Sequence, residues 1–247
     1  MIRLDAATVL LQWSTGGLLF GWYTTRKGEI GPGYAKLLRI VYGVFALGAV
    51  AWGVRYGVVL LRDIATGVLA LAALATYRNT TPRRDLIAPV VGVVGLIAAG
   101  IAAAQNASNI DVLVSLARVL VGAAFLGSVS DAMLLGHWYL VQPGMPRRLI
   151  NELTTVVLWI WPLEIIVLLL PTGMFSVLNG SIDDGWNGVL GWYWLASAIV
   201  TGVLVLVTRA ALKERSYSAV MAATGLMYLA ILTAFCTDII ARALLAG

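Results

Sequence analysis

Long apolar stretches separated by short polar loops fill this sequence and constrain its fold more than any other feature. A helix needs roughly 20 mainly apolar residues to cross a bilayer, and polar or Gly/Pro loops separate successive crossings. We therefore predict an all-α, polytopic transmembrane bundle of about eight helices, built as a single domain over residues 1–247. The expected helices span about 6–24, 37–57, 58–77, 86–105, 110–142, 148–171, 187–208 and 217–245.

The composition agrees with a protein whose main partner is the lipid bilayer. Only 12% of the residues are charged and 60% are hydrophobic, whereas an average soluble domain is about a quarter charged. The single cysteine, Cys236, excludes an internal disulfide framework, and the single histidine, His137, excludes multi-histidine metal sites and a haem held by two histidines of this chain. The basic residues lie in short loops, so we expect no nucleic-acid partner.

The loop charges predict the orientation of the bundle. Short loops on the cytoplasmic side of a membrane are enriched in Lys and Arg. We therefore place both termini on the outer (non-cytoplasmic) side of a cell membrane, and the Ala-, Val- and Gly-rich composition indicates a bacterial one. The opposite side holds Arg3, Arg55, Arg62 and Arg242, and the predicted cytoplasmic loops hold Arg26, Lys27, Lys36, Arg78, Arg83, Arg84, Arg147, Arg148, Arg209, Lys213 and Arg215.

The helix over 110–142 carries an unusual set of polar residues near its predicted cytoplasmic end. Asp131, His137, Trp138 and Tyr139 lie within nine residues, and Glu152 is expected at a similar depth in the next helix. Ionisable groups inside a membrane are expensive and often functional. A histidine beside a carboxylate can bind a quinone carbonyl and relay a proton. We predict a quinone headgroup site here, with a haem held by His137 and a ligand from another subunit as the alternative.

Each of these residues also has a structural interpretation. Trp138 and Tyr139 are typical aromatic anchors at the membrane interface, and Glu152 is a favourable first-turn acid beside basic neighbours. Asp131 is harder to explain in this way. Ala123 and Gly127 precede it at four-residue spacing and predict close packing of another helix, so Asp131 should face protein rather than lipid.

A second set of charges is expected in the outer half of the bundle. Asp238 and Arg242 are four residues apart in the favourable acid-then-base order and predict an intramembrane ion pair. Arg118 and Glu164 should lie at similar depth on neighbouring antiparallel helices, so we expect a second structural pair there.

Three functions follow from these observations. The first is an integral subunit of a larger respiratory electron-transfer complex, which anchors other subunits, lines a quinone site and is not catalytic alone. The second is a small-solute or ion transporter with a three-plus-three inverted repeat, indicated by similar segments at 39–50 and 118–129. The third is a membrane-embedded lipid-modifying enzyme, for which no nucleophile–base pair stands out.

Overall fold

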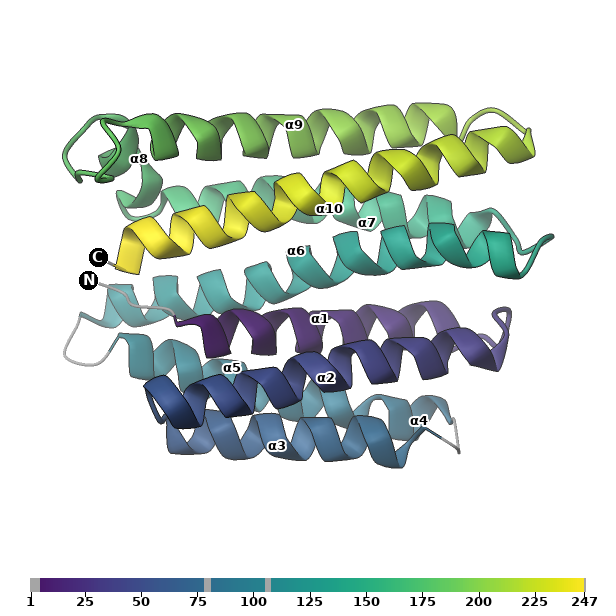
Figure 1. Cartoon of the computed structure of the whole chain (residues 1–247), viewed down its shortest axis with the longest axis horizontal. Helices are drawn as coiled ribbons and strands as arrows, with labels where there is room; N and C mark the ends of the chain where they lie inside the picture. The colour runs from purple at the N-terminus through teal and green to yellow at the C-terminus, as the bar shows by residue number, and fades with distance from the viewer. Residues whose placement is uncertain (1–4, 78–80, 105–107, 247) are drawn as a thin grey trace.

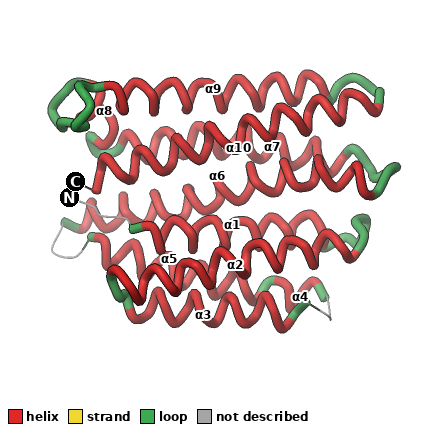
Figure 2. The backbone as a smooth tube through the Cα atoms, viewed as in Figure 1, coloured by secondary structure: helices red, strands yellow, loops and turns green. Residues whose placement is uncertain are grey.

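The computed structural model describes residues 5–77, 81–104 and 108–246, and within these ranges the chain forms helices and loops but no strand (Figures 1 and 2). Arg3 and Arg78 lie outside the described residues. The helices are α1 Ala6–Thr25, α2 Pro32–Tyr56, α3 Leu60–Ala75, α4 Pro82–Asp85, α5 Ile87–Ala103, α6 Asn109–Val141, α7 Arg148–Leu169, α8 Gly173–Leu178, α9 Val189–Ala211 and α10 Tyr217–Ala246.

The long helices follow the predicted segments closely, and the main difference is that α2 begins at Pro32 rather than near residue 37. Proline at the first helical position lacks only an amide hydrogen that would be unpaired there anyway, so it favours an early start. The tight turn after α2 is closed by side chains. Arg62 donates to the Gly57 carbonyl at 2.8 Å, and Asp63 accepts the Val59 amide at 3.1 Å.

The described residues contain six helices that are long and apolar enough to span a membrane, namely α2, α4 with α5, α6, α7, α9 and α10. Many large apolar side chains on these helices are exposed, including Val44, Val94 and Leu232. Such a surface suits lipid rather than water, and the protein is a helical, multi-pass membrane bundle. α3, with 16 residues, is too short to be counted. α1 is not among the six either, and most of its residues are buried in the centre of the molecule.

The helices form two groups that meet along α1 and α6 (Figure 1). One group contains α1, α2, α3 and α5, and the other contains α6, α7, α9 and α10. The two central helices touch through their backbones, because a Cβ atom added to Gly127 would lie 2.5 Å from the Gly16 Cα atom. The predicted small-residue stripe at Ala123 and Gly127 is therefore a helix-packing surface.

The loops gather at two ends of the bundle (Figure 2). The beginnings of α1 and α6, the ends of α5 and α10, α8 and the turn after α2 lie at one end, which we call the termini end. The loops after α1, α6 and α9 lie with α4 at the other end, which we call the basic end because it holds the described basic residues of the predicted cytoplasmic loops.

The loop before α9 is organised by one carboxylate. Asp184 Oδ1 accepts the amides of Trp186 at 2.9 Å and Gly188 at 2.8 Å, while Oδ2 accepts those of Leu190 at 2.8 Å and Gly191 at 3.4 Å. Desolvation alone would raise the pKa of Asp184, but the backbone hydrogen bonds outweigh it and hold the pKa below its usual value. The charge also satisfies amides at the beginning of α9 that have no helical partner.

Candidate functional site

Asp131 on α6 is completely buried and is held by hydroxyl groups from the neighbouring helices. The Tyr34 hydroxyl on α2 donates to Oδ1 at 2.7 Å, and the Thr24 hydroxyl on α1 lies 3.3 Å from Oδ2. One residue earlier, the Ser130 and Tyr42 hydroxyls lie 2.8 Å apart. Asp131 thus faces protein, as predicted, and it forms no ion pair within the described ranges.

The other residues predicted to share a site with Asp131 lie in different places. His137 is exposed, and its Nδ1 atom lies 3.4 Å from the Tyr228 hydroxyl on α10. Tyr139 is buried and donates to the Pro146 carbonyl at 2.7 Å. Six residues along an α-helix amount to about 240° of rotation, so Asp131 faces α1 and α2 while His137 faces α10.

Trp138 is the one predicted partner that reaches the surroundings of Asp131. Its ring lies 5.6 Å from the ring of Tyr34, and its Nε1 atom donates to Gln142 at 3.2 Å. Glu152 instead forms an exposed ion pair with Arg148 at 2.7 Å. Among the described residues, the members of the predicted quinone cluster therefore lie on several faces of the bundle.

The predicted ion pair between Asp238 and Arg242 is present near the termini end. Arg242 Nε lies 2.8 Å from each oxygen of Asp238, and both side chains are buried. Arg242 Nη2 also donates to the Arg118 carbonyl at 3.2 Å, which joins α10 to α6. A bidentate pair of this kind suits a site from which water is excluded.

Arg118 does not pair with Glu164 among the described residues, contrary to expectation. Its guanidinium donates instead to the carbonyls of Val167, at 3.1 Å, and Leu170. The last carbonyls of a helix have no helical amide to accept from, and Pro171 cannot supply one. Arg118 therefore stabilises the end of α7.

Glu164 is completely buried, and neither of its carboxylate oxygens has a hydrogen-bond partner in the described part of the chain. Its electrostatic neighbours are Asp238, Arg242 and Arg118. Gln12 of α1 contacts the same part of α6, where its Nε2 atom donates to the Val119 carbonyl at 2.9 Å.

Gly122 makes room for this charged group on α6. A Cβ atom added there would lie 2.4 Å from Arg242 Nη2 and 2.5 Å from Gln12 Nε2. A side chain at position 122 would therefore displace the guanidinium from its place against α6. No role for Gln12 was predicted from the sequence, although a polar amide side chain inside an apolar segment indicates a buried hydrogen-bonding group.

A cleft of about 460 Å³ opens between α1, α2 and α10 beside this charged group. The Trp13 ring lies between Phe45, at 4.9 Å, and Phe235, at 5.1 Å, and all three line the cleft with Trp52 and Arg242. Two buried donors on its wall, Trp13 Nε1 and Arg242 Nη1, have no partner within the residues described. The cleft therefore has a mainly apolar lining, and two of its lining residues each carry a buried donor without a partner in the described chain.

No known family model, curated protein or solved structure matches this chain. The assignment of function therefore depends on the chemistry of the site alone. Within the described ranges, no group of three or more His, Cys, Asp or Glu residues is placed to hold a metal ion. His137 lies beside Tyr228, and a haem held by His137 with a ligand from another subunit stays a prediction.

Proposed function

We propose that the chain is an integral membrane subunit of a respiratory electron-transfer complex and that it binds an isoprenoid quinone in the cleft between α1, α2 and α10. The cleft, with Trp13 Nε1 and Arg242 Nη1 as unpartnered donors, is the observation that carries the proposal. A quinone has carbonyl oxygens that accept hydrogen bonds and an apolar tail that suits a lipid-facing opening. An apolar pocket with a few convergent polar groups is the usual form of such a site.

The carboxylates behind the cleft are suited to proton transfer. Reduction of a quinone to a quinol takes up two electrons and two protons. Asp238 is hydrogen-bonded to Arg242, which lines the cleft, and Glu164 neighbours both. We propose that these two carboxyl groups exchange protons with the bound quinone. The electrons come from a redox group of a partner subunit, because the loops of this chain are too short to hold a soluble redox domain.

The orientation predicted from the loop charges places this site in the outer half of the membrane. The described basic loop residues lie at one end of the bundle, which we assign to the cytoplasmic side of a bacterial cell membrane. Both termini, the Asp238–Arg242 pair and the cleft then lie toward the outer side. The quinone site is thus proposed in the opposite half from Asp131 and His137.

A transporter of ions or small solutes is the second candidate. Glu164 favours it, since a buried carboxyl group without a partner in the described chain resembles the ionisable groups of membrane transport pathways. Accumulation of solute by liposomes that contain the purified chain alone would support this function and contradict the subunit proposal.

The proposal is tested by extraction in mild detergent, followed by analysis of the co-purifying subunits and of quinone per protein. Trp13→Phe keeps an aromatic ring, although a smaller one, and removes the indole donor, so bound quinone should fall by about three- to tenfold. Trp192→Phe, at an exposed site outside the cleft, is the matched control and should have no effect. The proposal fails if no quinone co-purifies or if both variants lose it equally.

Two variants at the basic end separate the proposed site from the sequence-predicted one. His137→Ala and Asp131→Asn should leave quinone-linked turnover of the complex unchanged if the quinone occupies the cleft. Loss of turnover in these variants, with normal turnover in Trp13→Phe, would move the headgroup site to the basic end.

A further inference from the structure

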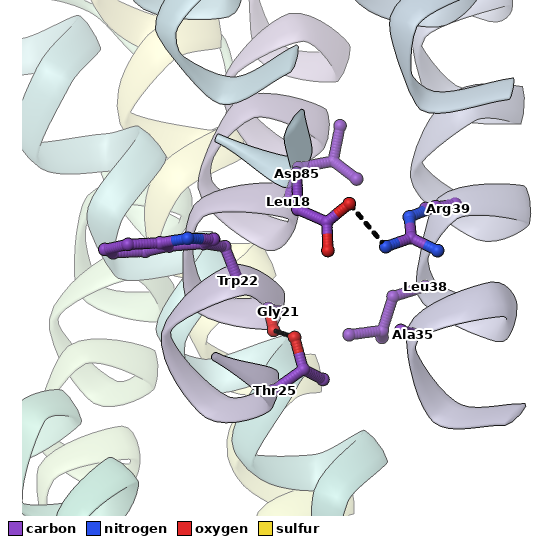
Figure 3. A pocket seen from close by; sticks show the side chains of 8 residues that line it. All are labelled: Leu18, Gly21, Trp22, Thr25, Ala35, Leu38, Arg39 and Asp85. Carbon is purple, nitrogen blue, oxygen red and sulfur yellow. Dashed lines mark hydrogen bonds and ion pairs between the residues drawn. The ribbon is translucent and has the colours of Figure 1, made fainter. Parts of the chain in front are cut away.

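A buried ion pair lies between α2 and α4 at the basic end of the molecule. Arg39 Nη2 lies 2.7 Å from Asp85 Oδ1, and the Arg39 residue is only 5% exposed (Figure 3). Arg39 Nη1 is also buried and has no hydrogen-bond partner in the part of the chain described. The guanidinium therefore has donor capacity beyond its bond to Asp85.

A small hollow beside this pair continues into a larger cavity. The hollow is walled by α1, through Trp22 and Thr25, and by α2, through Ala35 and Leu38 (Figure 3). The larger cavity, of about 430 Å³, shares Thr25, Ala35 and Asp85 with it and is lined by the α1–α2 loop. The two spaces thus adjoin at these three residues, and Asp85 borders both of them.

The wall of the larger cavity carries uncompensated positive charge. Arg26 and Lys27 both line it, and among the described residues the only carboxylate in its lining is that of Asp85, which is paired with Arg39. Glu29, the acid nearest to them in the loop, is engaged by Arg148 at 2.6 Å. The space is therefore electropositive.

The wall is also held in place. The Arg26 guanidinium lies 4.1 Å from the ring centroid of Tyr23 and 5.4 Å from that of Trp22. The Trp22 Nε1 atom donates to the Pro82 carbonyl at 2.8 Å, which fixes α1 against the beginning of α4. A bound anion would therefore meet a largely preformed site.

We infer that this cavity binds the phosphate group of an anionic molecule, with Arg26 and Lys27 as its main contacts and Arg39, in the adjoining hollow, as a further positive charge nearby. Guanidinium and ammonium groups are the side chains that proteins use for phosphate. The cavity lies at the basic end of a membrane bundle, and basic pockets at the ends of such bundles bind anionic headgroups. The phosphate belongs either to a phospholipid or to a soluble phosphate compound. This inference is independent of the quinone proposal.

The test measures binding of phosphatidylglycerol and of phosphatidylcholine to the purified full chain by native mass spectrometry. Phosphatidylglycerol should bind at least about tenfold more tightly. Substitution of both Arg26 and Lys27 by Gln should abolish that preference. The matched control replaces Lys213 and Arg215 by Gln, which removes the same charge from the same end, outside the cavity, and should retain it.

A second arm titrates inorganic phosphate into the chain in neutral detergent. Saturable binding that is lost in the Arg26/Lys27 variant, together with no preference for phosphatidylglycerol, identifies a soluble phosphate compound as the ligand. Displacement of phosphatidylglycerol by phosphate only at high salt identifies the lipid. The inference is overturned if the control variant loses binding as strongly as the Arg26/Lys27 variant, or if neither phosphate source binds.

Discussion

Removal of Arg242 should destabilise the bundle far more than removal of an exposed arginine. Asp238 is completely buried, and Arg242 is its hydrogen-bonding partner among the described side chains. Arg242→Met leaves that carboxylate buried without its cation and also takes the cation from beside Glu164. Breaking one side of a buried pair costs about 3–5 kcal/mol, so the free energy of unfolding should fall by that amount.

Asp238→Asn should cost less, because Arg242 keeps its bond to the Arg118 carbonyl and its proximity to Glu164. The double variant should lose about 2–3 kcal/mol less unfolding free energy than the sum of the losses in the two single variants. The reason is that the second substitution removes the buried group that the first one left without a partner. Unfolding free energies in bicelles, measured by steric trapping, give all four values of this cycle.

The exposed pair of Arg148 and Glu152 is the matched control, with the same four-residue spacing on one helix. Its coupling energy should be about 0.5 kcal/mol or less, because solvent screens the attraction between the two charges and ordering both side chains costs conformational entropy. Equal coupling in the two pairs, or strictly additive effects at Asp238 and Arg242, would refute the reasoning.

Three further predictions test other parts of the structure. Gly127→Val forces a side chain into the backbone of Gly16 and should lower the stability of the bundle by about 3 kcal/mol, which a fall in Tm would report. Gly67→Val is the control, because a Cβ atom there meets nothing within 4 Å, and it should lower Tm far less. Tyr34→Phe removes a donor from Asp131 and should cost about 1–3 kcal/mol in unfolding free energy. Hydrogen exchange at the beginning of α9 should show protection by Asp184 that is present above pH ~4 and lost as the pH falls through its lowered pKa.

Features that depend on local sequence were predictable. The apolar runs gave the positions of the long helices, because crossing a membrane requires a continuous apolar segment. The Asp238–Arg242 pair follows from four-residue spacing on one helix, and the burial of Asp131 follows from the small residues that precede it. Each of these depends on residues within about two helical turns of one another.

Features that depend on how helices pack were not predictable. Asp131 and His137 are close in the sequence, but rotation along α6 directs them to different neighbours. Arg118 pairs with carbonyls because α7 ends beside it, which its own sequence does not reveal. The cleft unites Trp13 with residues of α2 and α10 that are far away in the chain, so no local pattern indicates it.

The most direct test of the quinone proposal is photoaffinity labelling of the intact complex with an azidoquinone, followed by peptide mapping. The proposal predicts that labels concentrate on the α1 segment around Trp13 and on the α10 segment from Phe235 to Ala243, and that excess unlabelled quinone removes them. Labels concentrated around His137 and Tyr228, or spread evenly over the lipid-facing helices, would contradict it.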